Sequence, residues 1–193
     1  HNDLIYRISN EAGRYAPKTR HVEVFMSVNN DVGAGGGNPA YGVVTGSAIS
    51  ADYYGVYSFQ DKISRGNNCI DIEGLEPTDN TAPNVQGGYV FKIDRLDAGD
   101  AGVSGGGRSF ALVQPKEWTS YPSHLQVATN QQKTYLGNTL TAMYNACLSP
   151  NFMDPVLGYQ AHLDVPAAID HWWFSILPKS ADAFRLSGYW HKS

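Results

Sequence analysis

The sequence contains few cysteines, and this shortage narrows the kinds of site it can build. Its two cysteines, Cys69 and Cys147, cannot form a metal site on their own. In an exported protein they could pair, but their spacing along the chain says nothing about their proximity. Two independent buried thiols are the favoured interpretation, because free cysteine behaves as a small hydrophobe.

Basic residues are also scarce. Lysine and arginine total 14 against 18 aspartates and glutamates, which gives a net charge of −4. A nucleic-acid binder normally shows a basic face, so no nucleic-acid partner is expected. No apolar run is long enough to cross a bilayer, so we expect no membrane span in this sequence.

Charged residues of both signs make up only 17% of the chain, whereas glycine, asparagine, tyrosine and tryptophan are plentiful. Such a composition is common among secreted bacterial proteins. The first residue is His1, and no charged-then-apolar leader follows it. Because the chain opens in a helical pattern and closes in a strand-like one, we expect an internal piece of a longer protein.

Strand patterns dominate the first half, after one short helix. Leu4, Ile5, Ile8 and Ala12 recur at helical spacing, and Gly13 offers the left-handed conformation that ends a helix. Alternating or continuous apolar residues then predict strands at 21–28, 53–59, 88–94 and 109–113, with a shorter run at 69–72. Segments 29–50, 73–87 and 97–107, rich in turn-forming residues, are predicted to be loops.

Helical patterns dominate after Pro115. One apolar stripe runs from Leu136 to Cys147 and ends before Ser149-Pro150. Asp164 can cap a second helix, whose stripe comprises Ile169, Trp172, Trp173, Ile176 and Leu177. The sequence therefore predicts an α+β fold, with an antiparallel β-rich first half and a mainly helical second half.

Several chemical motifs have plain structural interpretations. The glycine runs at 33–37 and 105–107 lack the strand–loop–helix context of a phosphate loop, so flexible loops are favoured. The six histidines are scattered, which makes a zinc site improbable, and no metal ligand is assigned. Trp172 and Trp173 lie on the helical stripe and are expected in the core rather than on a sugar-stacking surface. Asp94 is interpreted as holding a turn after its strand.

Asp182 is the strongest catalytic candidate. It follows the second apolar helix and precedes the aromatic run at 189–190, and in kinases a loop carboxylate accepts the proton of the hydroxyl that is phosphorylated. The alternative is that Asp182 only stabilises its own loop. Arg185 could contact a phosphate or pair with a neighbouring acid, and both options stay open.

Five segments, in order, resemble the spore coat protein H (CotH) kinase family. They are Glu11 to Val24 with its helix-to-strand pattern, Tyr54 to Ile63 (YGVYSFQDKI), Gly87 to Asp94 (GGYVFKID), Asp164 to Asp170, and Asp182 to Lys192 (DAFRLSGYWHK). The resemblance covers nearly the whole chain. It implies an atypical protein kinase with a two-lobed, kinase-like fold, secreted or attached to the cell envelope.

The resemblance also implies roles for particular residues. Asp182 would be the catalytic base, and Asp61 with Lys62 would contribute to the nucleotide site, although an ordinary surface pair at a strand end is equally consistent. ATP and Mg²⁺ would be the cofactors, and a serine or threonine of a coat or surface protein would be the substrate. Residues 1–114 would belong to the amino-terminal lobe, and residues 115–193 would begin the carboxy-terminal lobe.

The sequence departs from the family pattern at several points. A glutamate at the strand end is replaced by Asp61, and an asparagine two residues before the catalytic aspartate is replaced by Ser180. The phosphate-gripping strands expected upstream and the W-D-x-D metal segment expected downstream are absent, so we expect a fragment that is inactive by itself. The two substitutions also fit a second hypothesis, a catalytically inactive, kinase-shaped surface module that binds protein or glycan.

Overall fold

The computed structural model describes residues 2–25, 53–98, 100–115 and 128–193. Within these ranges the chain is α+β, with antiparallel sheets and three α-helices, as predicted. Strands come mostly first and helices mostly later. The elements are α1 (Asn2–Glu11), β1 (Thr19–Phe25), β2 (Tyr53–Gln60), η1 (Asn84–Gln86), β3 (Tyr89–Ile93), β4 (Gly102–Gly105), β5 (Arg108–Gln114), α2 (Asn130–Leu148), η2 (Tyr159–Ala161), α3 (Val165–Ile176) and β6 (Gly188–Lys192).

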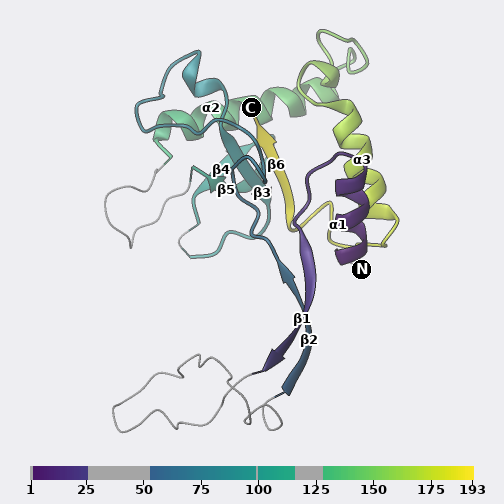
Figure 1. Cartoon of the computed structure of the whole chain (residues 1–193). Coiled ribbons are helices and arrows are strands. Elements are labelled where there is room, and N and C mark those ends of the chain that lie inside the picture. The colour runs from purple at the N-terminus through teal and green to yellow at the C-terminus, as the bar shows by residue number, and fades with distance from the viewer. Residues whose placement is uncertain (1, 26–52, 99, 116–127) are drawn as a thin grey trace, which may run out of the picture.

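A four-stranded antiparallel sheet, in the order β4-β5-β3-β6, forms the centre of the molecule. β6 returns from the far end of the chain and pairs along the whole of β3, from Tyr89 opposite Lys192 to Ile93 opposite Gly188. The second half of the sequence therefore supplies a strand to the sheet of the first half. Figure 1 shows β6 beside β3, with α2 lying across the sheet.

The hydrophobic core lies between this sheet and α2. Tyr89, Leu112 and Leu136 are almost fully buried, and the Phe91 and Phe110 rings meet edge to face with centroids 5.8 Å apart. Burying such side chains is the main force that holds α2 on the sheet. The predicted stripe of α2 is buried at Leu136 and Leu140 and becomes exposed towards Cys147.

Helix ends follow the predicted signals in most places. Asp164 caps α3 by accepting a hydrogen bond from the Ala167 amide, and α2 ends at Leu148, just before Ser149-Pro150. Gly13 has a φ of +79°, as expected for the residue that stops α1. α2 begins with a capping box formed by Thr129 and Gln132, which the apolar pattern alone did not indicate.

The prediction for the glycine-rich segment 97–107 is wrong in part. Segment 97–107 is not only a loop, because it contains β4, and Gly106-Gly107, with φ of +57° and +74°, form the tight turn between β4 and β5. The short run at 69–72 takes part in one isolated bridge, between Ile70 and Arg65. The predictions for 26–52, including the glycine run at 33–37, lie outside the described residues.

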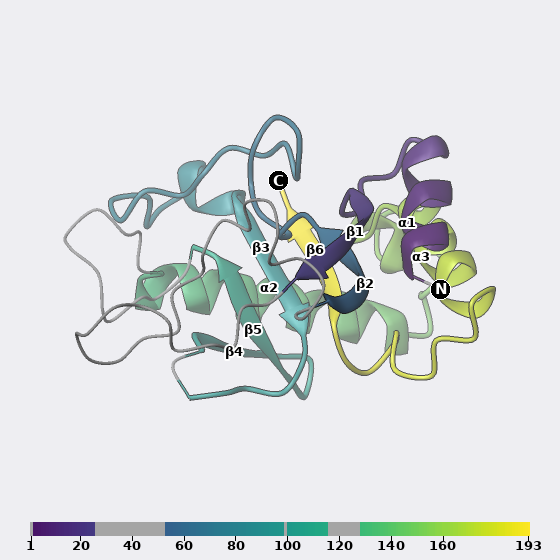
Figure 2. The same ribbon diagram turned by 60° about the horizontal axis from the view of Figure 1, so that its bottom comes forward.

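A second, two-stranded sheet is formed by β1 and β2, which pair antiparallel from Thr19 opposite Gln60. Figure 1 shows this ribbon projecting from the body of the molecule. α1 and α3 lie side by side next to it in both views (Figures 1 and 2), and the Arg14 guanidinium bonds the Asp170 carboxylate at 2.7 Å. This ion pair joins the segment after α1 to α3.

Candidate functional site

The loop that carries Asp182 connects α3 to β6. The loop begins near Lys179 and ends at Ser187, and these two residues have φ angles of 54° and 56°. Such left-handed values are uncommon for residues other than glycine. Between them, the Asp182 carbonyl accepts hydrogen bonds from the amides of Arg185 and Leu186 at 2.8 and 2.7 Å. The backbone around Asp182 is thus a defined turn.

The Asp182 carboxylate is exposed and pairs with Arg185. The Arg185 Nη2 atom donates to Asp182 Oδ1 at 2.8 Å. Of the two options left open for Arg185, the structure shows the acid pairing. Because both side chains are well exposed, the pair contributes little to stability and can open at small cost. A carboxylate and a guanidinium therefore lie next to each other on an accessible loop.

Aromatic contacts attach this loop to the elements on either side. His171 of α3 packs against Trp190 of β6, with ring centroids 4.9 Å apart, and against Phe184 of the loop at 6.2 Å. The His171 Nε2 and Trp190 Nε1 atoms are buried and have no hydrogen-bond partner among the described residues. Burial lowers the pKa of His171. His171 thus contacts both the loop and β6, a contact that the scattered histidines of the sequence did not indicate.

Acidification should loosen this cluster. The half-buried His171 takes up a proton less readily than the same histidine in the unfolded chain, whose ordinary pKa is about 6.5, because burial lowers the pKa of His171. The unfolded state therefore binds more protons as the pH falls below that value, and the free energy of unfolding decreases. We expect His171→Phe to flatten the pH dependence of urea unfolding between neutral and mildly acidic pH. The exposed control His191→Gln should keep the wild-type dependence, and an unchanged slope in His171→Phe would contradict the expectation.

Asp94 ties the far end of the same loop to the central sheet. Its carboxylate accepts hydrogen bonds from Lys92 Nζ at 3.1 Å, from the Arg95 amide at 2.8 Å and from Ser187 Oγ at 3.4 Å. Partial burial opposes the charge, but these donors outweigh it and hold the pKa of Asp94 below its usual value. This agrees with the interpretation of Asp94 as a structural residue that holds a turn.

Asp61 and Lys62 follow directly after β2 and are exposed. The Asp61 amide donates to the Lys18 carbonyl at 3.0 Å, which continues the β1–β2 pairing by one residue. Neither side chain forms an ion pair or hydrogen bond with another described residue. Asp61 lies near Tyr15. The pKa of Tyr15 is raised to about 12, mainly by burial and to a smaller extent by the neighbouring Cys69 and the charge of Asp61. No hydrogen bond or ion pair among the described residues joins this strand end to Asp182, whose partner is Arg185, so its part in a nucleotide site stays a prediction.

Other candidate ligands do not assemble. Cys69 and Cys147 are both free, so the expectation of independent thiols is confirmed, but neither is fully buried: Cys69 is half-buried and Cys147 is exposed. Across residues 2–25, 53–98, 100–115 and 128–193, no three acidic, histidine or cysteine side chains gather into a metal-binding group. No helix in the same ranges is long and apolar enough to cross a bilayer.

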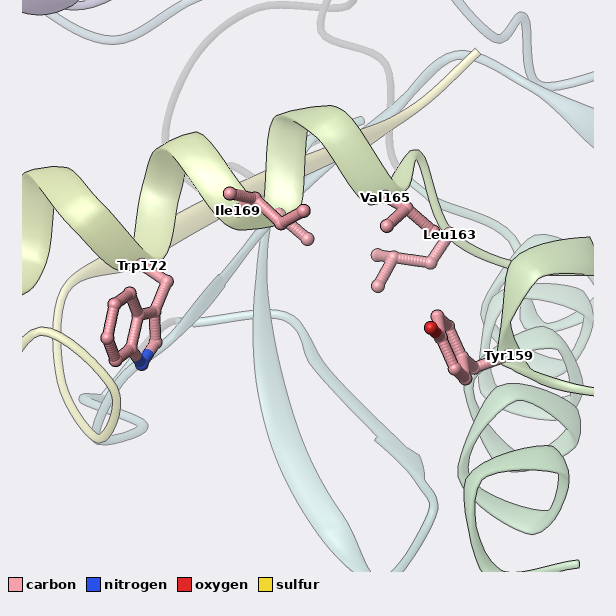
Figure 3. Close-up of a pocket in the computed structure, with 6 residues that line it drawn as sticks. Tyr159, Leu163, Val165, Ile169 and Trp172 are labelled. Carbon is pink, nitrogen blue, oxygen red and sulfur yellow. The ribbon is translucent and has the colours of Figure 1, made fainter. Parts of the chain in front are cut away.

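The face of α3 that was expected in the core is open to solvent. Trp172 and Trp173 are 47% and 49% exposed, and Ile169 is 51% exposed, so the core assignment of both tryptophans is wrong. Trp172, Ile169 and Tyr159 border a hollow of about 300 Å³. Figure 3 shows these side chains, with Leu163 and Val165 between Ile169 and Tyr159. Asp182 does not line this hollow. The helical period identified the residues of the stripe correctly, but nothing in the described chain covers them.

The described residues thus form an α+β protein whose candidate site is a loop carrying a carboxylate, held between α3 and β6, an edge strand of the four-stranded sheet. Comparison with known protein families matches residues 1–193 to the family described as CotH kinase protein. The chain belongs to this family. No curated protein and no solved structure matches it.

Proposed function

We propose that the protein is a CotH-type protein kinase, which transfers the γ-phosphate of ATP to a serine or threonine hydroxyl of a coat or surface protein. The observation that carries the proposal is the family match over residues 1–193, together with the position of Asp182 in the loop before β6. By the same reasoning, we place the protein outside the cell or in the cell envelope.

In this proposal Asp182 accepts the proton of the attacking hydroxyl. The described turn fixes its backbone, and the exposed side chain can reach a substrate from solvent. The adjacent Arg185 guanidinium has the charge and fork geometry suited to a phosphate. It would have to leave the Asp182 carboxylate to take that role.

The available residues fit ATP and Mg²⁺ only in part. Lys62 and Asp61 are the proposed contacts of the nucleotide, and Asp182 and Arg185 are the groups at the reacting end. When bound, ATP supplies the phosphoryl group and Mg²⁺ neutralises its charge. A Mg²⁺ ion held by phosphates needs only one or two carboxylates, so the described residues are compatible with such an ion without forming a dedicated cage.

Substitution of Asp182 tests the proposal. With radiolabelled ATP and the longest form of the protein that its gene encodes, we expect Asp182→Ala and Asp182→Asn to reduce phosphate incorporation by about 10²- to 10⁴-fold, the usual contribution of a general base. Asp97→Ala is the matched control, because Asp97 is also an exposed loop aspartate whose side chain has no described partner. Incorporation that survives in both Asp182 variants would remove this residue from the mechanism.

A second candidate function is a kinase-shaped module that binds protein or glycan without catalysis. Two observations favour it: Arg185 already engages the Asp182 carboxylate, and the apolar face of α3 is open. Wild-type protein that incorporates no phosphate in the same assay, while remaining folded, would favour this alternative.

A further inference from the structure

A hollow of about 640 Å³ lies between the loop that carries η1 and the first turns of α2. Figures 1 and 2 show this loop beside the amino-terminal half of the helix. The hollow is shallow and open to solvent, and its volume is within the range of small-molecule sites. Asp182 is not among its lining residues. We propose that this hollow binds an uncharged saccharide, independently of any phosphoryl transfer.

Buried hydrogen bonds fix the two walls of the hollow relative to each other. Gln132, only 1% exposed, donates from Nε2 to the backbone carbonyls of Glu76 at 2.8 Å and Asp79 at 3.2 Å. Thr129, the cap of α2, bonds Asn80 through its hydroxyl. These contacts tie the loop to the helix, so the hollow is formed before any ligand arrives. A preformed site avoids much of the entropy cost of ordering side chains on binding.

One wall presents polar side chains without partners. Asn130, Gln131, Thr134 and Asn138 come from successive turns of α2 and line the hollow. None of these four side chains bonds another described residue. Amides and hydroxyls offer both donors and acceptors, as sugar hydroxyls do. The wall can therefore exchange its hydrogen bonds with water for hydrogen bonds with a polyhydroxylated ring.

Apolar groups border the same space. Tyr135 lies among the polar residues, and its ring stacks on Tyr89 with centroids 6.2 Å apart and planes 19° from parallel. Val85, across the hollow, is buried, and its carbonyl accepts a hydrogen bond from the Tyr89 hydroxyl at 2.8 Å. A pyranose has C–H faces as well as hydroxyl edges, and a site with both kinds of surface matches it.

The lining argues against other ligand classes. Its described residues include no aspartate, glutamate, lysine, arginine or histidine, so a phosphate or metal ion would lack an opposite charge there. Lys192 Nζ lies 6.0 Å from the centroid of the Tyr135 ring but is not a lining residue. An extended peptide is best recognised by the free edge of a strand, whereas the described walls are a helix and a loop.

The test uses cellohexaose, maltohexaose and N-acetylchitohexaose as probes, with binding measured by saturation-transfer NMR and calorimetry. We expect at least one to bind the wild type and the double variant Thr134→Ala/Asn138→Ala to bind it about tenfold more weakly, because two hydrogen-bonding groups are lost. Asn145→Ala is the matched control, since Asn145 is an exposed asparagine two turns further along α2 and outside the hollow. Thermal melting checks that each variant is folded, and Gln131→Ala replaces the double variant if that one is not.

Asp182→Ala should retain full saccharide binding, which separates this inference from the kinase proposal. Absence of binding by all three probes at millimolar concentration would overturn the inference. Equal affinity in the wild type and the lining variant would also overturn it, as would binding of an uncharged Gly-Ser peptide without binding of any sugar.

Discussion

Replacing Gly137 with alanine should destabilise the protein, although alanine is the better helix former. Propensity alone predicts a gain of about 1 kcal/mol for this change inside a helix. However, α2 contacts β4 at this point, and a Cβ atom on residue 137 would lie 2.5 Å from the Ser104 carbonyl oxygen. The facing Gly105 is equally close, since its Cβ would lie 2.6 Å from the Gly137 carbonyl.

The Ser104 and Gly137 carbonyl oxygens are backbone atoms, so the helix must move away from the sheet to make room for a methyl group. We expect Gly137→Ala to lower the free energy of unfolding by about 2 kcal/mol, in the usual range for overpacking. Chemical denaturation measures this, with the exposed Asn145→Ala expected within about 0.5 kcal/mol of the wild type. A stabilised Gly137→Ala protein would show that the helix and sheet are further apart than described.

The open face of α3 should bind a hydrophobic dye in the native state. Ile169, Trp172, Trp173, Ile176 and Leu177 are each more than two-fifths exposed, and Phe152 and Leu157 before the helix are exposed as well. Soluble proteins rarely leave so many large apolar side chains together on the surface unless something binds there. We expect strong ANS fluorescence from protein that still melts cooperatively.

Substitution on the helix should remove this signal without unfolding the chain. Ile169→Ser/Trp172→Ser changes two residues that border the hollow of Figure 3 and should reduce ANS fluorescence by about half or more. Leu96→Ser changes an exposed leucine that is distant in sequence from α3, and it should leave the ANS fluorescence unchanged. Equal fluorescence in all three proteins would mean that the dye binds elsewhere.

Local patterns predicted most of the fold. The spacing of apolar residues, together with end signals such as Gly13 and Asp164, predicted the three α-helices and the strands β1, β2, β3 and β5. β4 was missed because three of its four residues are glycine or serine, and only Val103 points into the core with a large side chain. What decides its conformation is pairing with β5, a contact between strands that local composition does not reveal.

The candidate site was predicted less completely. The place of Asp182 between a helix and a strand follows from sequence and resemblance, but its pairing with Arg185 depends on the turn geometry of a loop. The contacts of His171 with Phe184 and Trp190 join three elements, so no spacing could have indicated them. Periodicity also could not show that Trp172 is exposed, because it reports which residues share a face and not what covers that face.

The pairing of β6 with β3 also affects how the protein is made. β5 follows β3 closely and covers one of its edges, but β6 emerges from the ribosome about a hundred residues later, on the order of ten seconds at ordinary rates of synthesis. During that interval the other edge of β3, with the apolar Val90 and Phe91, has no strand to pair with. Nascent chains on one polysome could join along these edges, so we expect efficient production to depend on a chaperone that shields them until translation passes Lys192.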